Sequence, residues 1–314
     1  IESRGKKIPK IDYRDNDEKT YNLIGKGNTL CVFQLGTSGG TVDLCKRIKP
    51  KNMEDLSFIM TLARPHAKKV RDPFIETRNG KKKVKFFHKG LERAFTATLG
   101  FPLYEESLLF LVQDIAKWDL HKADGLRKMT KDKGKHPEKE KKLREDFIHD
   151  AQINGGLTLQ MANRVWDDVI ANFSEYSFNK SHSVLYSMTS YLTAYLKANY
   201  PLEFLTANLT FKSDKNTPKT DEEKIRIRDE IRNLGVKIVP PDINTSEATY
   251  KIIDDKTLMT GFDSMKNMGK DSVPYIISQR PFSSFDDFLS KVGAKVRAPS
   301  ISALAASGAL DSFG

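Results

Sequence analysis

The sequence predicts a mainly α-helical protein with a few short strands and a small separate module at its C-terminal end. Two observations support this prediction. Apolar residues recur every three or four positions over 105–117 and 184–200, which is the period of helices with one buried face. Apolar residues make up 39% and charged residues 30% of the 314, which is typical of a soluble globular chain, and the length suggests about two domains.

The basic charge is concentrated in the first half of the chain. Residues 1–150 carry 33 Lys and Arg against 22 Asp and Glu, whereas residues 151–314 carry 19 of each kind. A one-sided excess of this sort is typical of a polyanion partner, with solubilising surface lysine as the alternative. The two cysteines, Cys31 and Cys45, exclude a disulfide scaffold and a cysteine-based zinc site. No apolar run is long enough to cross a membrane, and a cytoplasmic protein is expected.

Caps and breakers place the elements of the first half. Asp17 is expected to cap a short helix that ends at Gly25, and Pro65 stops the helical spacing of Met53–Leu62. Residues 105–117 form an amphipathic helix, and 122–149 a basic helical region broken near 133–137. Residues 81–87 are expected to be a basic hairpin or loop.

The second half contains the clearest helix of the sequence. Its apolar stripe covers 184–200 and is followed by Pro201; an amphipathic helix at 162–173 precedes it. A polar linker over 211–222, a charged helix over 223–234 and a strand over 236–239 follow. We therefore predict a linker at 1–16, a main domain at 17–245 and a small module at 246–314.

The strongest motif, Phe178-Asn179-Lys180-Ser181-His182-Ser183, directly precedes the clearest helix. A helix start offers backbone N–H groups and a positive dipole end, and the Lys, Ser and His side chains add donors, so the run suits a phosphate group. Simple capping by one of the two serines is the alternative.

Three further groups of residues suit phosphate or a base. Arg127 and Lys131 share a helix face with Lys128 beside them, in a segment (122–144) that holds ten Lys and Arg against four Asp and Glu. Arg64 stands before a proline turn, and Tyr104 at a helix start is placed to stack on a base or sugar. A solvated charged helix and an ordinary loop are the alternatives, and Glu105 and Glu106 are expected at most to complement the helix dipole.

The segment 261–270 looks like a helix-hairpin-helix, in which a tight turn aims backbone amides at a DNA phosphate. Asn267 stands where a glycine usually sits, and asparagine tolerates the left-handed backbone that such a turn needs. A plain turn is the alternative. No phosphate-binding loop, calcium loop or metal-ligand spacing of histidines is present in the sequence.

Taken in order, these segments resemble one family. The chain is similar to the fingers region of the family C bacterial replicative DNA polymerases, the DNA polymerase III alpha subunits, over nearly its whole length. The run 178–182 is its most specific motif; the others are Val32-Phe33-Gln34-Leu35, Arg64-Pro65, Tyr104-Glu105-Glu106, Leu126-Arg127-Lys128, Tyr195-Leu196-Lys197-Ala198, Pro240-Pro241-Asp242-Ile243-Asn244 and Ser307-Gly308-Ala309-Leu310-Asp311.

The resemblance implies a helical fingers domain, followed by a helix-hairpin-helix module, in an enzyme that adds deoxynucleotides to a primer. It implies that the Mg²⁺ ions are held by palm aspartates outside this chain, so this chain holds no metal and no catalytic carboxylate and is expected to be inactive alone. Further expected partners are primer-template DNA, dNTP, the palm and thumb of the same polypeptide, and the sliding clamp and other replisome subunits, with no membrane. The implied dNTP-binding residues are Arg64, Tyr104, Arg127, Lys128, Lys131, Asn179, Lys180, Ser181 and His182; the implied DNA-binding residues are Lys81, Lys82, Lys83, Lys266, Asn267, Gly269 and Lys270.

Three runs depart from the family pattern. The family usually has Arg-Pro-Gly-Pro at 64–67, Tyr-Gln-Glu-Gln at 104–107 and Ala-Met-Gly-Lys-Lys at 129–133, where this chain has Arg-Pro-His-Ala, Tyr-Glu-Glu-Ser and Met-Thr-Lys-Asp-Lys. A phage or plasmid copy, or a specialised paralogue, would account for such divergence. A stand-alone helix-hairpin-helix DNA-binding protein remains the alternative function.

Overall fold

The computed structural model describes residues 1–7, 10–14, 16–131, 134–171, 173, 178–213, 217–269 and 271–314, without the side chains of His66, Lys131 and Ser213. Its contacts divide the chain into two compact units. We call Lys10–Tyr195 the N-terminal unit, and Ile1–Pro9 together with Leu196–Gly314 the C-terminal unit. The division lies well before residue 245, where the sequence suggests that the main domain ends.

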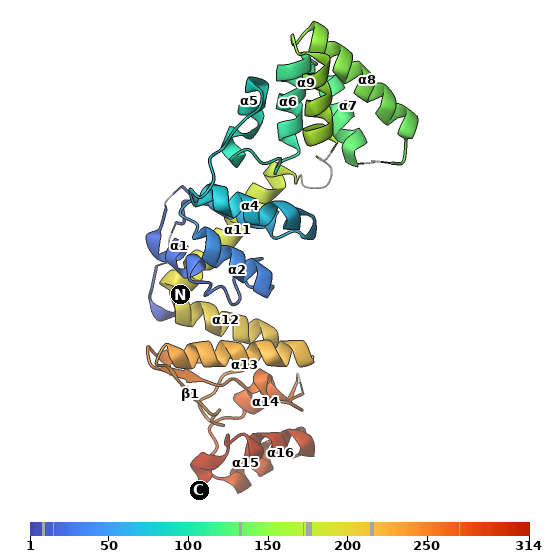
Figure 1. Ribbon diagram of the computed structural model, residues 1–314. Coiled ribbons are helices and arrows are strands. Elements are labelled where there is room, and N and C mark those ends of the chain that lie inside the picture. Colours follow the sequence, from blue (N-terminus) through green and yellow to red (C-terminus); the bar gives the residue numbers. More distant parts are fainter. Residues whose placement is uncertain are drawn as a thin grey trace. The chain divides into compact units, whose positions relative to one another are not determined.

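Among the described residues of the N-terminal unit, the regular elements are all helices (Figure 1). Its α-helices are α1 (Glu18–Gly25), α2 (Gly39–Ile48), α3 (Met53–Leu62), α4 (Lys68–Arg78), α5 (Glu92–Phe95), α6 (Glu106–Ala116), α7 (Leu120–Lys131), α8 (Pro137–Ile153), α9 (Leu159–Val165) and α11 (Lys180–Asn199), whose last four residues belong to the C-terminal unit. Short 3-10 turns lie at Pro65–Ala67, Lys89–Leu91 and Thr96–Thr98, and a π-helical turn lies at Trp166–Ile170.

The first core of this unit lies among α1, α2, α3, α4 and α11. Asp17 caps α1 by accepting from the Thr20 backbone N–H, as predicted, and Asn52 caps α3 in the same way through Asp55. Leu56 and Ile59 of α3 and Tyr191 of α11 are fully buried in this core. The chain between α1 and α2 turns irregularly, and Gln34 has a positive φ.

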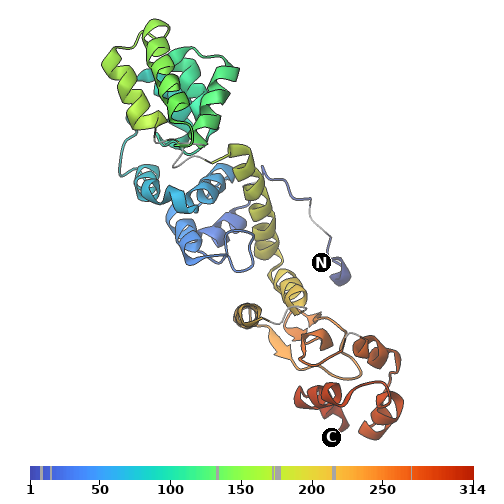
Figure 2. The same cartoon turned by 90° about the vertical axis from the view of Figure 1, so that its right-hand side faces the viewer.

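The second core lies among α5, α6, α7, α8 and α9, and in Figures 1 and 2 the last four of these helices lie side by side. Leu108, Leu111 and Ile115 of α6 meet Leu126 of α7 and Phe147 of α8 there, and all five are buried. The single helix predicted over 162–173 is instead α9 followed by the π-helical turn. The segment 81–87 is a loop, which is one of the two predicted forms.

The C-terminal unit combines helices with one small sheet. A 3-10 turn at Glu2–Arg4 is followed by α12 (Pro201–Ser213), α13 (Pro218–Asn233), α14 (Ser272–Ser278), α15 (Phe285–Val292) and α16 (Ala298–Ala306), with further 3-10 turns at Phe262–Ser264 and Asp311–Phe313. The strands β1 (Lys237–Val239), β2 (Lys251–Asp254) and β3 (Thr257–Met259) form a sheet in the order β1-β3-β2. β3 is parallel to β1 and antiparallel to β2, so β2 is an edge strand.

The predictions for this unit were correct in part. The strand predicted at 236–239 is β1, but β2, β3 and α12 had not been predicted. Most of the polar linker predicted over 211–222 is helical instead, because α12 extends to Ser213 and α13 begins at Pro218; residues 214–216 lie outside the described residues. The core of the module that follows the sheet includes Phe262, Val273, Phe288 and Leu304. Within the described residues, no helix has both the length and the apolar character that a membrane span needs.

Candidate functional site

The site is built around the start of α11, which begins at Lys180 and not at 184 as predicted. Asn179 caps the helix: its Oδ1 accepts from the His182 backbone N–H at 2.8 Å and from Ser181 Oγ at 2.6 Å. The asparagine thus takes the capping role that the sequence suggested for a serine. Ser183, the other candidate cap, is buried, and its Oγ donates to the Ser57 carbonyl at 2.9 Å.

A short backbone ladder brings the start of α6 against the start of α11. Phe178 and Tyr104 form a parallel bridge, in which the Phe178 N–H donates to the Leu103 carbonyl at 2.9 Å and the Glu105 N–H donates to the Phe178 carbonyl at 3.1 Å. Both Glu106 carboxylate oxygens accept from the Lys180 backbone N–H at 3.1 Å. Glu106 therefore complements the dipole of α11, whereas the sequence suggested that of its own helix.

Glu105 joins α6, α7 and α11. Its side chain is 6% exposed; Oε1 accepts from Asn179 Nδ2 at 3.0 Å, and Oε2 accepts from Arg127 Nη1 at 3.2 Å. Asn179 Nδ2 also donates to Glu106 at 3.1 Å. Glu105 thus lies at the centre of the hydrogen-bond network.

Arg127 lies between two carboxylates. Besides Glu105 it contacts Asp124, one helical turn earlier on α7, with Nε at 2.8 Å and Nη2 at 2.7 Å from Asp124 Oδ1. Lys128 Nζ reaches Asp124 Oδ2 at 2.8 Å, although 71% of its side chain is exposed. Hydrogen bonds from Lys128 first and Arg127 second lower the pKa of Asp124, and the bond to Asp124 raises the pKa of Arg127.

Aromatic rings connect the remaining cations to this network. Lys180 Nζ lies 5.5 Å from the centroid of the Tyr104 ring, and Arg64 Cζ lies 4.8 Å from that of Phe178. The His182 ring packs between Phe178 and Tyr186, with centroid distances of 5.4 Å and 4.1 Å. Four segments distant in sequence therefore meet in one place.

Tyr104 connects this site to the first core of the N-terminal unit. Its side chain is buried, and its hydroxyl lies 2.7 Å from Ser57 Oγ, which in turn lies 2.9 Å from Ser183 Oγ. Burial raises the pKa of Tyr104 to about 12. With 3% of the residue exposed, the ring could stack on a base only if it moved out of the core.

The structure therefore brings together Arg64, Tyr104, Arg127, Lys128, Asn179, Lys180, Ser181 and His182 in the N-terminal unit; the side chain of Lys131 lies outside the described residues. The sequence analysis did not predict that Glu105, Glu106 and Asp124 accept hydrogen bonds from these donors. The sign of it in the sequence was the position of these carboxylates, next to Tyr104 and one helical turn before Arg127.

The implied DNA-binding residues lie elsewhere. Lys81, Lys82 and Lys83 are exposed in the loop after α4, with Lys82 Nζ 2.6 Å from Glu76. In the C-terminal unit, Asn267 has φ 66°, which confirms the left-handed backbone expected of it, and its carbonyl accepts from Ser300 Oγ at 2.8 Å. Exposed Lys266 and Asn267 line a cavity of about 330 Å³ beside the start of α13; Gly269 is exposed, and Lys270 lies outside the described residues.

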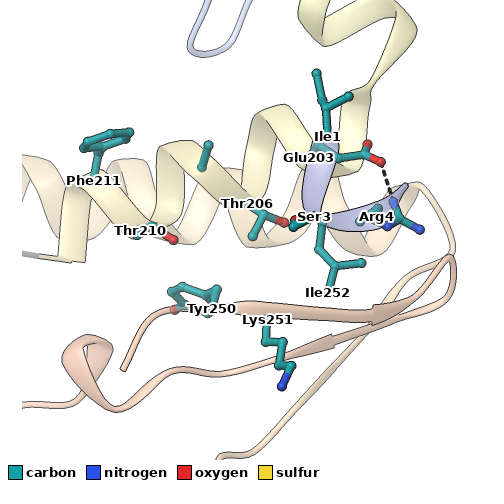
Figure 3. Close-up of a pocket in the computed structure, with 11 residues that line it drawn as sticks. Ile1, Ser3, Arg4, Glu203, Thr206, Thr210, Phe211, Tyr250, Lys251 and Ile252 are labelled. Carbon is teal, nitrogen blue, oxygen red and sulfur yellow. Dashed lines mark hydrogen bonds and ion pairs between the residues drawn. The ribbon is translucent and has the colours of Figure 1, made fainter. Parts of the chain in front are cut away.

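A larger cavity of about 410 Å³ in the C-terminal unit lies between the 3-10 turn at Glu2–Arg4, α12 and β2 (Figure 3). Arg4 forms an ion pair with Glu203 at its rim, and Thr206 Oγ1 is buried in its wall without a partner among the described residues. None of the implied site residues lines this cavity.

No metal centre is visible in the described part of the chain, where no group of three or more His, Cys, Asp or Glu side chains is arranged to hold an ion. The two carboxylates at the site, Glu105 and Glu106, accept from Asn179, Arg127 and the Lys180 amide. They are already hydrogen-bonded by these donors, so they do not fit a magnesium site.

Two family models match the chain. The model of the bacterial DNA polymerase III alpha subunit finger domain matches residues 1–155, and that of the helix-hairpin-helix motif matches residues 235–314. The second match includes the hairpin at Asn267 and all of the sheet.

Relatives named DNA polymerase III subunit alpha match nearly the whole chain. That of Thermus aquaticus is 34% identical over 100% of this chain, and that of Pseudomonas aeruginosa is 35% identical over 97%. The one from Borreliella burgdorferi is 35% identical over 90%. The chain spans only 26%, 26% and 24% of these three proteins, or about a quarter of their length. The chain belongs to the bacterial DNA polymerase III alpha subunit family, of which it contains the finger domain and a helix-hairpin-helix motif.

Proposed function

We propose that this chain is the part of a DNA-directed DNA polymerase that binds the incoming deoxynucleoside triphosphate and the primer-template DNA. The observation that carries the proposal is the gathering of Arg64, Arg127, Lys128 and Lys180 around the start of α11. These cations come from three separate segments, since Arg127 and Lys128 both lie on α7, and their convergence suits a ligand with several phosphates.

The residues would have different roles in such a site. Arg127 offers a planar fork of donors to phosphate oxygens, and the exposed Lys128 supplies a mobile point charge. Asn179 fixes the start of α11, and Tyr104 supports it from the core. Because the Lys180 and His182 backbone N–H groups are already bonded to side chains, the cationic side chains carry most of the binding.

DNA is proposed to contact two other places. The exposed lysines at 81–83 suit backbone phosphates, and the turn at Asn267 suits the phosphate contact of a helix-hairpin-helix. Polymerisation itself would need Mg²⁺ from palm carboxylates in the rest of the polypeptide, and clamp and replisome contacts would also lie there.

The test is a calorimetric titration of the chain with dATP and, separately, with primed DNA, each at low and high salt. The double variant Arg127→Ala, Lys128→Ala is expected to lose dATP binding while keeping most of its salt-sensitive DNA binding. The matched control, Lys19→Ala with Lys26→Ala, removes two exposed charges, one from α1 and one from its C-cap, and should bind dATP as the unaltered chain does.

DNA binding without any dATP binding, in the unaltered chain as in the double variant, would contradict the triphosphate site. That result would favour the second candidate, a helix-hairpin-helix DNA-binding protein, which the match over 235–314 supports.

A further inference from the structure

The triphosphate site proposed above contains its own anion. Glu105 accepts from Arg127 at 3.2 Å and from Asn179 at 3.0 Å, and its side chain is 6% exposed. A carboxylate in this position occupies donors that a phosphate oxygen would otherwise accept from. Glu105 would compete in this way with the phosphate oxygens of any bound nucleotide.

We propose that Glu105 acts as an internal competitor that holds Arg127 until a triphosphate displaces it, and so sets the affinity and phosphate selectivity of the site. The proposal rests on the triphosphate-binding function of Arg127. It makes Glu105 a positioning residue that acts through Arg127, without itself contacting the ligand.

The chemistry of the two partners explains why the effect is selective. Arg127 is also paired with Asp124, and only 22% of its side chain is exposed. Its guanidinium therefore has little freedom to move away from the two carboxylates. A ligand with three phosphates can offer enough negative charge to replace Glu105, whereas a single phosphate competes poorly. The site would therefore favour triphosphates over monophosphates.

Glutamine at this position would remove the negative charge beside Arg127 with little change of shape. Asn179 and Arg127 both present donors to this side chain, so the single glutamine oxygen accepts from one of them and its NH₂ faces the other. In either orientation Arg127 loses its carboxylate partner at this position. Glu105→Gln therefore tests the competing charge.

The experiment is calorimetric binding of dATP, dADP and dAMP to the 314-residue chain and its variants. Glu105→Gln should tighten dATP binding about three- to tenfold, since the ligand no longer displaces a carboxylate from Arg127, and should change dAMP binding much less. Asp55→Asn is the matched control: Asp55 is another buried carboxylate paired with an arginine, Arg78 at 2.8 Å, and its loss should leave the three affinities unchanged. A purely structural role for Glu105 would weaken all three ligands alike.

A second measurement covers the case in which Glu105→Gln does not fold. The side-chain NMR signal of Arg127 in the unaltered chain should shift on saturation with dATP, because its donors pass from carboxylate to phosphate. An unmoved signal with dATP bound, or dATP affinity unchanged or weakened in folded Glu105→Gln, overturns the role of Glu105. Arg127→Ala that binds dATP as well as the unaltered chain is a different failure, namely of the proposed function itself.

Discussion

At the scale of single residues, Asn179 links the helix start to its surroundings in two ways. Its oxygen caps α11, and its Nδ2 donates to Glu105 and Glu106. We expect Asn179→Ala to lower the free energy of unfolding by about 1–2 kcal/mol, as for other lost caps. Urea unfolding measures this.

Replacement of Asn179 by aspartate separates the two roles. Aspartate caps a helix about as well as asparagine, but it cannot donate, and it would face two carboxylates. Asn179→Asp should therefore be less stable than the unaltered chain although its cap is kept. Equal stability would show that the Nδ2 hydrogen bonds contribute nothing.

Tyr104 gives the structure a dependence on alkaline pH. Its pKa is raised to about 12 in the folded chain, against 10.0 for an unperturbed tyrosine, because the ring is buried. The folded state therefore binds the proton more tightly, so stability is lost as pH rises above the unfolded pKa towards the folded one. Tyr104→Phe should be less stable at neutral pH, because Ser57 Oγ loses the Tyr104 hydroxyl and keeps Ser183 Oγ, yet should show a shallower loss of stability between these two pH values. A loss as steep as that of the unaltered chain would contradict the burial of Tyr104.

At the scale of elements, two glycines make opposite predictions. A Cβ on Gly125, inside α7, would meet nothing within 4 Å, so Gly125→Ala should stabilise the chain by about 0.5–1 kcal/mol. A Cβ on Gly155, after α8, would lie 1.9 Å from the Ile115 carbonyl oxygen, so Gly155→Ala should be destabilising. Thermal unfolding of the pair tests both, and stabilisation by the second variant would contradict the packing of α8 against α6.

Elements with a clear cap or breaker were predicted well from the sequence. The bounds of α3 are those predicted, because Asn52 caps it and the chain turns at Pro65. α12 was not predicted, because Pro201 was interpreted as the end of the preceding helix. Pro201 is instead the first residue of α12, a position at which the fixed φ of proline is favourable. The helix also combines buried Leu205 with Phe211, which is 78% exposed, so its apolar residues form no clear stripe.

The donors of the site were predicted, but their acceptors were not. Lys180 near a helix start and Arg127 on a helix face were recognisable in the sequence as cations suited to phosphate. Glu105 and Asn179 are 74 residues apart, and the bridge between Tyr104 and Phe178 brings them together. A contact made by tertiary structure at that separation leaves no local pattern in one sequence.

At the scale of the whole molecule, the excess positive charge of the first 150 residues should appear in DNA binding. Replacing Lys81, Lys82 and Lys83 by alanine should lessen the slope of log K against log salt by up to about 3, since each phosphate contact contributes roughly 0.9. The variant Lys19→Ala with Lys26→Ala controls for net charge. If both variants change the slope in proportion to the charge removed, the loop has no special role.

The most direct test of the account is backbone amide NMR of the isotope-labelled chain during titration with dATP. We predict that the shifted signals cluster at the starts of α6 and α11 and around Arg127 on α7, and that they disappear in the variant Arg127→Ala, Lys128→Ala. Saturable shifts centred elsewhere, for example on the hairpin at Asn267 or the cavity beside Thr206, would contradict a triphosphate site at the start of α11.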